Sequence, residues 1–244
     1  MADFRPENKE YIAIGDIHGC LDQLQELVEE KLAPTKNQTL VFLGDYIDRG
    51  PNSKGVVEYL IQLRDRYNCV FLMGNHEIMM LEYLSFGSSN AWSLNGGDAT
   101  LASYSPNGIL EIPDSHIDFI SSCPYYYDTP NFFFVHAGLK PYFTIEDNLS
   151  KFSPHDLTWE RDHLAKEHIE TQDYVWEKTV VCGHTPQSSP LILNKLICID
   201  TGCVYSKSSN LGKLTAIRLP SYEIVQVKNQ QVKRTIKNWL SSWI

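Results

Sequence analysis

The chain has 244 residues, of which 43% are hydrophobic and 21% charged, a balance typical of a folded globular protein. Its formal net charge of −9 argues against nucleic-acid or membrane-surface binding, which relies on basic side chains that neutralise phosphates. The polar start MADFRPENKEY lacks the apolar core of a signal peptide, and the six cysteines form no CxxC pair. We therefore expect a cytoplasmic protein with free, buried thiols, and a single domain over residues 1–244 because no linker divides the chain.

The first half of the chain alternates short apolar runs with amphipathic stretches. YIAI (residues 11–14), LVFL (40–43) and VFLM (70–73) predict strands, and residues 21–32, 53–67 and 78–86 have the spacing of helices. Asp16, Asp45 and Asn75, which follow the three runs, are 29 and 30 residues apart. This repeat has the length of a strand–helix–strand unit and predicts a parallel sheet in an α/β fold.

The second half is rich in strand signals. YYYDT (125–129) and NFFFVHA (131–137) predict a hairpin, and further strands are expected within residues 178–184, 190–193, 195–202, 213–220 and 222–227. Helical periodicity is confined mainly to residues 154–168.

Five apolar runs end beside a residue whose side chain is Asp, Asn or His. Because the carboxyl ends of parallel strands lie side by side, we expect these side chains to converge. The expected set is Asp16, His18, Asp45, Asn75, His136 and His184. Oxygen and imidazole donors suit Mn, Fe, Zn or Mg, and six ligands suit two ions that share one carboxylate. Each residue alone is better explained as a helix cap or turn residue; their coincidence at five strand ends favours a metal site.

Three further residues lie in the same turns. Asp48 and Arg49 follow Asp45, and His76 follows Asn75. An arginine beside two metal ions suits a phosphate group, and a histidine near a carboxylate suits a general acid. Taken alone, Asp48 and Arg49 are better explained as a surface ion pair, whereas their place in the cluster favours the roles in the site.

The motifs GDIHG, GDYIDRG, GNHE, HAG and GHT, in this order, resemble those of the phosphoprotein phosphatase family of calcineurin-like metallophosphoesterases. WSLNGGDATLASY and the IDTG and KLTAI segments are similar to its bacterial and phage branch. The resemblance implies two mixed β-sheets packed as a sandwich and flanked by helices. It also implies that Asp16, His18 and Asp45 hold one metal ion and that Asp45, Asn75, His136 and His184 hold the second.

The same resemblance implies roles for the remaining residues. His76 would donate a proton, oriented by Asp48, and Arg49 would bind phosphate. Trp159-Glu160-Arg161 resembles a WxR element, which makes Arg161 a second candidate phosphate ligand, with a helix-surface ion pair as the alternative. Residues 206–211 form a longer stretch than the family pattern has, so their part in substrate choice is open.

The leading interpretation is a serine/threonine-type protein phosphatase that uses two divalent ions, with Mn favoured, and a metal-bridging hydroxide. Its substrate would be a phosphoprotein or a phosphorylated small molecule. The alternative is a dinucleoside (diadenosine) tetraphosphate hydrolase; such enzymes usually lack the Asp that stands here as Asp48 and carry Asp in place of Glu77. A non-catalytic metal-binding protein is disfavoured because no expected ligand is missing. The native metal, the substrate and the oligomeric state stay open.

Overall fold

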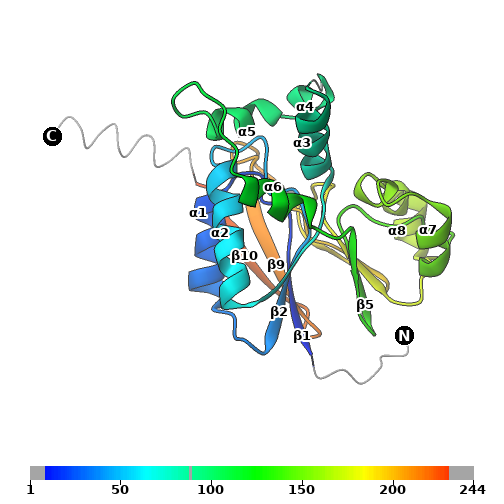
Figure 1. The fold of residues 1–244 in the computed structure, drawn as a ribbon. Helices are drawn as coiled ribbons and strands as arrows, with labels where there is room; N and C mark the ends of the chain where they lie inside the picture. The colour runs from blue at the N-terminus through cyan, green and yellow to red at the C-terminus, as the bar shows by residue number, and fades with distance from the viewer. Residues whose placement is uncertain (1–8, 88–89, 231–244) are drawn as a thin grey trace.

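Two mixed five-stranded sheets form the centre of the structure, a computed structural model that describes residues 9–87 and 90–230 (Figure 1). The first sheet has the order β10-β9-β1-β2-β3 and the second the order β4-β5-β6-β8-β7. The strands of the first sheet are β1 (Glu10–Ile14), β2 (Gln38–Phe42), β3 (Asn68–Phe71), β9 (Lys213–Leu219) and β10 (Glu223–Lys228). Those of the second are β4 (Tyr126–Asp128), β5 (Phe132–Val135), β6 (Thr179–Cys182), β7 (Leu191–Ile192) and β8 (Leu196–Cys198).

The first sheet has three parallel strands and an antiparallel pair at one edge, and the second has a parallel centre between two antiparallel edge strands. β1, β2 and β3 are parallel, as are β5, β6 and β8, whereas β9 and β10 extend the first sheet and β4 and β7 the second in antiparallel pairs. The expected hairpin is the β4–β5 pair, closed by the Thr129 amide, which donates to the Phe132 carbonyl at 3.0 Å. The predicted α/β fold with two mixed sheets is confirmed.

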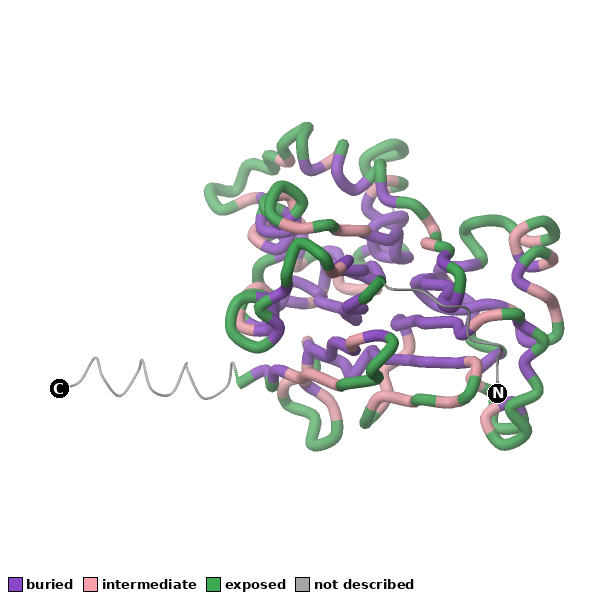
Figure 2. The backbone as a smooth tube through the Cα atoms, turned by 90° about the horizontal axis from the view of Figure 1, so that it is seen from below, coloured by how far each residue is buried: buried purple, intermediate pink, exposed green. Residues whose placement is uncertain are grey.

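The sheets pack face to face because their strands alternate two apolar faces. Tyr11 and Ala13 of β1 lie in one buried cluster with Phe132 and Phe134 of β5, between the sheets, whereas the neighbouring Ile12 packs among the helices on the outer side. Each fully buried side chain of this size contributes roughly 1.5–3 kcal/mol relative to leaving it exposed. The backbone tube is accordingly buried along the strands and exposed in the outer turns (Figure 2).

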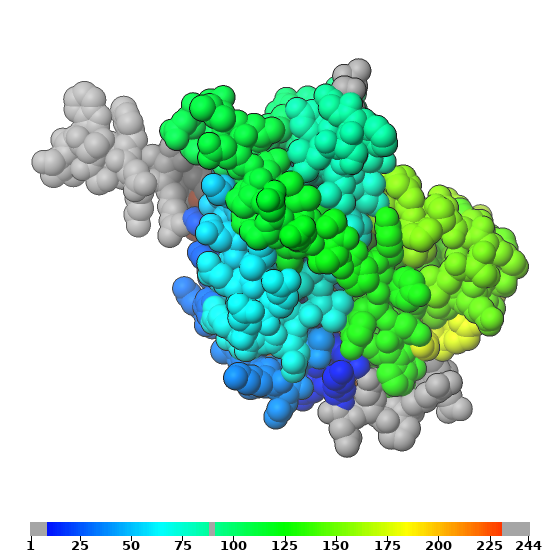
Figure 3. Space-filling model, viewed as in Figure 1, coloured from blue at the N-terminus to red at the C-terminus, as the bar shows by residue number. Residues whose placement is uncertain are grey.

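Helices cover the outer faces of the two sheets. On the side of the first sheet lie α1 (Leu21–Gln25), which continues into the π-helical η1 (Glu26–Leu32), α2 (Ser53–Arg66), α3 (Asn75–Phe86), α4 (Asn90–Leu94), α5 (Gly97–Ser103) and α6 (Asp114–Ser121). α7 (Ile145–Lys151) and α8 (Lys166–Thr171) form the opposite flank, together with the 3-10 turns η2 (Asp156–Thr158) and η3 (Asp162–Leu164). In the space-filling view α3 to α6 occupy the upper and central surface, and α7 and α8 the right flank (Figure 3).

One segment and the two chain ends differ from what the sequence analysis expected or lie outside its test. Residues 154–168 do not form one helix; the turns η2 and η3 precede α8, and the Glu160 carboxylate accepts from the amides of Arg161 and Asp162, which competes with the helical hydrogen bonds. The ends of the expected domain, residues 1–8 and 231–244, lie outside the described residues. All six cysteines are described and are free thiols, as expected; five of them are buried and Cys69 is half-buried. Among residues 9–87 and 90–230 no helix is both long and apolar enough to cross a bilayer.

Candidate metal centre

The predicted ligands meet where the carboxyl ends of both sheets adjoin. Strands β1, β2 and β3 of the first sheet and β5 and β6 of the second each end just before a member of this set. The backbone amide of His184 donates to both carboxylate oxygens of Asp16, at 3.0 and 3.1 Å, across 168 positions of chain. The structure therefore brings all six side chains together, and their role as ligands stays a prediction.

Asp45 lies at the centre of the set. Its Oδ2 is 3.5 Å from His18 Nε2, and its Oδ1 is 3.3 Å from His136 Nε2. The two carboxylate oxygens thus face two different groups of potential ligands, the arrangement that a bridge between two ions requires. Within the described chain, His18, Asp45 and His76 could hold one ion, and Asp45, His136 and His184 another.

The turn that carries Asp45 is unusually tight. Asp45 has φ +53°, and Gly44 before it has φ +104°. A Cβ on Gly44 would lie 2.8 Å from His136 Nδ1, and one on Gly74 would lie 2.3 Å from Asp45 Oδ1. Only glycine allows this close approach, and backbone strain at non-glycine residues is typical of functional sites.

The carboxylate of Glu77 supports the backbone of this turn through hydrogen bonds. Its Oε2 accepts hydrogen bonds from the amides of Asp45 (2.9 Å) and Gly74 (3.0 Å), and its Oε1 accepts from the amide of Tyr46 (2.8 Å). The side chain is fully buried. Glu77 therefore fixes the backbone of the central carboxylate and reaches neither ligand atoms nor solvent.

His136, Asn75 and His184 form an arrangement that fits a cation. His136 Nδ1 lies 2.7 Å from the Leu43 carbonyl, which can only accept, so Nδ1 carries the hydrogen in the neutral ring. In that neutral form His136 Nε2 directs a lone pair at Asn75 Oδ1 (3.1 Å) and Asp45 Oδ1 (3.3 Å), and it lies 3.2 Å from His184 Nδ1. Acceptor atoms that converge in this way need a positive charge between them, which either a proton on Nε2 or a metal ion supplies.

His18 is oriented in the same manner. Its Nδ1 lies 2.8 Å from the Ile47 carbonyl, which leaves the lone pair of Nε2 facing Asp45 and the Nη1 atom of Arg49 at 2.6 Å. Arg49 therefore lies against a predicted ligand atom, and the guanidinium would have to move outwards to share the site with an ion and a phosphate.

The titration of the cluster follows from its burial. Burial lowers the pKa of His18 to about 3 and that of His184 to about 2, so both rings are neutral, the form that binds metals. Burial, with repulsion from Asp200 and Asp45, raises the pKa of Asp16 well above its usual range. Burial opposes protonation of His136, yet the charge and hydrogen bond of Asp45 raise its pKa to about 9. The same negative potential attracts a divalent cation.

His76 and Asp48 form a buried pair beside the cluster. His76 Nδ1 lies 2.6 Å from Asp48 Oδ2, so Nε2 of the ring points towards Asp45 Oδ2, 3.8 Å away. Asp48 is held in turn, because Trp92 Nε1 donates to its Oδ2 at 2.8 Å and the Thr100 hydroxyl to its Oδ1 at 2.6 Å. This geometry suits a proton donor whose ring orientation is fixed by its hydrogen bond to Asp48.

Arg161 is exposed and lies outside any helix, in the segment between η2 and η3. Its positive charge helps to lower the pKa of His184, after burial and the charge of His136. Because Arg161 lies outside a helix, the alternative of a helix-surface ion pair is wrong. Its guanidinium is close enough to His184 to lower the pKa of that imidazole.

Sequence reasoning missed several residues of the centre. Asp200 follows β8, a sixth strand end with an acidic residue; it is buried, accepts from the Gly202 amide at 2.8 Å, and burial raises its pKa to about 6. The strand-end rule would have found it. The indole of Trp92 donates to Asp48, a contact that no local sequence pattern signals.

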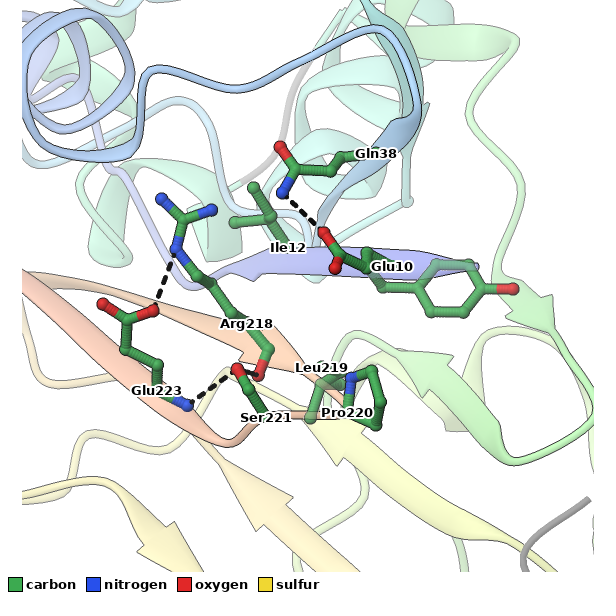
Figure 4. Close-up of a pocket in the computed structure, with 9 residues that line it drawn as sticks. Glu10, Ile12, Gln38, Arg218, Leu219, Pro220, Ser221 and Glu223 are labelled. Atoms are coloured by element: carbon green, nitrogen blue, oxygen red, sulfur yellow. Dashed lines mark hydrogen bonds and ion pairs between the residues drawn. The ribbon is translucent and has the colours of Figure 1, made fainter. Parts of the chain in front are cut away.

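A cavity of about 330 Å³ lies at the opposite end of the first sheet (Figure 4). Its charged residues have partners within the lining, since Arg218 Nε is 3.3 Å from Glu223 Oε2 and the neutral Gln38 donates to Glu10 at 2.8 Å. It opens beside the start of β1, whereas the metal-ligand candidates follow the ends of the strands. It is therefore separate from the candidate centre.

The chain belongs to the calcineurin-like phosphoesterase family, which matches residues 10–225. Among curated relatives, the bis(5'-nucleosyl)-tetraphosphatase PrpE [asymmetrical] of Oceanobacillus iheyensis is 32% identical over 236 residues, 89% of this chain and 92% of the relative. The protein of the same name from Bacillus velezensis is 30% identical over 240 residues, 90% of this chain and 92% of the relative.

Solved structures share the fold. A putative diadenosine tetraphosphatase superposes with a TM-score of 0.67 at 24% identity, covering 93% of this chain and 96% of its own. A serine/threonine phosphatase of Saccharomyces cerevisiae superposes with a TM-score of 0.60 at 16% identity, covering 91% of this chain and 80% of its own. At these identities the similarity shows the fold alone.

Proposed function

We propose that this chain hydrolyses bis(5'-nucleosyl) tetraphosphates asymmetrically, to a nucleoside triphosphate and a nucleoside monophosphate. The observation that carries the proposal is the similarity, over about nine-tenths of the chain, to relatives named for this activity. It favours the alternative that the sequence left open over the protein phosphatase. The converging carboxylate, amide and imidazole ligands supply a site of the kind that phosphoester and phosphoanhydride hydrolysis needs.

Glu77 and Asp48, the two residues that the sequence analysis counted against this activity, form hydrogen bonds with groups of the protein itself. Glu77 binds backbone amides beneath the Asp45 turn, and Asp48 binds His76, Trp92 and Thr100. Their identity therefore reflects how the turn and the imidazole are held. Glu77, which binds only backbone amides, does not discriminate a nucleotide from a phosphoprotein.

The residues of the candidate centre have separate proposed roles. Asp16, His18 and Asp45 would hold one divalent ion, and Asp45, Asn75, His136 and His184 the other, with Mn favoured. When bound, the two ions supply positive charge for the phosphate oxygens and lower the pKa of water. Arg49 and Arg161 bind and orient the phosphate chain, because a guanidinium fork matches two phosphate oxygens. Ligands come from both sheets, so we also propose that the chain acts as a single catalytic domain.

A second candidate is the phosphomonoesterase that the sequence suggested first. The buried Asp48–His76 pair favours it, because a serine alkoxide needs a proton to depart, whereas a phosphate group ionises with a pKa of about 6 and leaves as a stable anion.

Product analysis tests the proposal. The Mn-loaded protein is incubated with bis(5'-adenosyl) tetraphosphate, and the nucleotides are separated by anion exchange at early times. We expect ATP and AMP in equal amounts and no reaction after chelation of the metal. ADP as the sole product, or an intact substrate with a protein that hydrolyses a phosphoserine peptide, would reject the proposal.

A further inference from the structure

The ring of Trp159 lies at the edge of the candidate metal centre. Its centroid is 5.8 Å from that of the His184 imidazole, with the two planes at 81°. Trp159 is half-buried, since part of it packs against the apolar cluster beneath the first sheet's helices. An indole that is anchored on one side and accessible on the other is suited to bind a flat ligand beside the metal ligands.

Hydrogen bonds of the backbone connect the segment around Trp159 to the candidate metal centre. The amide of Ala137, next to His136, donates to the carbonyl of Leu157 at 3.1 Å. Buried Glu160 accepts the amide of Arg161 at 2.9 Å, which closes the turn on the other side of the indole. The ring is therefore positioned before a ligand arrives, which reduces the entropy that binding would cost.

Two other side chains extend this surface. The exposed imidazole of His155 is nearly parallel to the indole, at 28°, with ring centroids 6.4 Å apart. The guanidinium carbon of Arg161 is 6.0 Å from the indole centroid, at the outer limit of a cation–π contact. An aromatic surface with an adjacent cation matches a nucleobase joined to phosphates.

We propose that Trp159, with His155 beside it, forms the stacking wall of a nucleobase subsite adjoining the metal centre. The inference rests on the proposed nucleotide substrate and names which part of the chain holds its base. Because the indole is so close to a metal-ligand imidazole, the base that it stacks belongs to the nucleotide whose own first phosphate reaches the centre. This places cleavage beside that phosphate and yields a nucleoside monophosphate, as asymmetrical hydrolysis requires.

Calorimetric titration of the Mn-loaded protein with AMP and with ribose 5-phosphate measures the contribution of the base directly. Stacking on an aromatic side chain strengthens binding by roughly 5- to 150-fold, and we expect AMP to bind more tightly by a factor in this range. Trp159→Leu should bring the two dissociation constants close to each other by weakening AMP alone. Trp159→Phe should keep most of the preference. Tyr142→Leu is the matched control, because this exposed ring packs against His168 rather than a site residue.

Three results would overturn the subsite: equal binding of AMP and ribose 5-phosphate to the wild-type protein, equal weakening of both ligands by Trp159→Leu, or loss of the preference in Tyr142→Leu. The first needs no variant, so the test holds even if Trp159→Leu does not fold. Hydrolysis of the dinucleotide is measured in parallel. A preference for AMP without such hydrolysis supports the subsite and rejects the proposed function, whereas hydrolysis without the preference does the reverse.

Discussion

Replacement of His76 by asparagine separates its role as a proton donor from a general role in the site. His76 Nδ1 is held by Asp48 at 2.6 Å, and the opposite nitrogen points towards the central carboxylate at 3.8 Å. The variant removes this donor while asparagine retains a polar side chain of similar reach. The loss of activity should therefore depend on how much the leaving group needs a proton.

The size of the effect follows from the chemistry of the leaving groups. General acid catalysis is worth roughly 10²- to 10⁴-fold, and a serine alkoxide needs all of it. A nucleoside triphosphate leaves as an anion whose phosphate has a pKa of about 6 and needs little. We expect His76→Asn to lose about 10²- to 10⁴-fold in kcat on a phosphoserine peptide and less than about tenfold on bis(5'-adenosyl) tetraphosphate.

The assay compares single-turnover rates on both substrates, where the chemical step limits the rate. Metal content and Tm are measured alongside, and Asp48→Asn serves as a milder version of the same change because it leaves the imidazole in place. Equal losses on the two substrates at unchanged metal content would refute the role of proton donor. His76 would then position phosphate or water.

The other predictions concern the metal ligands, the phosphate ligands and the support of the central turn. Asp45→Asn should lose both ions by elemental analysis, because each carboxylate oxygen faces a different group of ligands; retention of one ion at full occupancy would contradict the bridge. Arg49→Ala and Arg161→Ala should lower kcat/KM with normal metal content, and unchanged kinetics in either would remove that arginine from the site. Glu77→Gln should leave at least one buried amide unsatisfied, at a cost of about 1–3 kcal/mol and a Tm lower by roughly 2–10 °C; a Tm equal to that of the wild type would show that the turn holds itself.

Much of the fold was predictable because its signals are local. The apolar run 11–14 lies within β1, and the runs 40–43 and 70–73 begin in β2 and β3 and continue past their ends. The spacing of Asp16, Asp45 and Asn75 places these three residues at the ends of neighbouring strands. The convergence of six side chains from two sheets followed from the same rule, applied to each half of the chain.

Other features depend on contacts that no local pattern carries. The left-handed backbone of Asp45 and His184 is imposed by tertiary packing, and the bond from Trp92 to Asp48 joins residues 44 positions apart. Residues 154–168 have helical spacing, but Glu160 binds the backbone that follows it, which favours turns. The sequence preference for a phosphoprotein rested on Glu77 and Asp48, which bind the protein's own turn and imidazole, and the similarity to tetraphosphatases favours the alternative.

The most direct test of the account is a competition between the two candidate substrates in one reaction. The wild-type protein, loaded with Mn, receives equal concentrations of bis(5'-adenosyl) tetraphosphate and a phosphoserine peptide, and the initial ratio of products gives the ratio of the two kcat/KM values. The account predicts that ATP and AMP accumulate faster than phosphate is released from the peptide. Faster dephosphorylation of the peptide would contradict it.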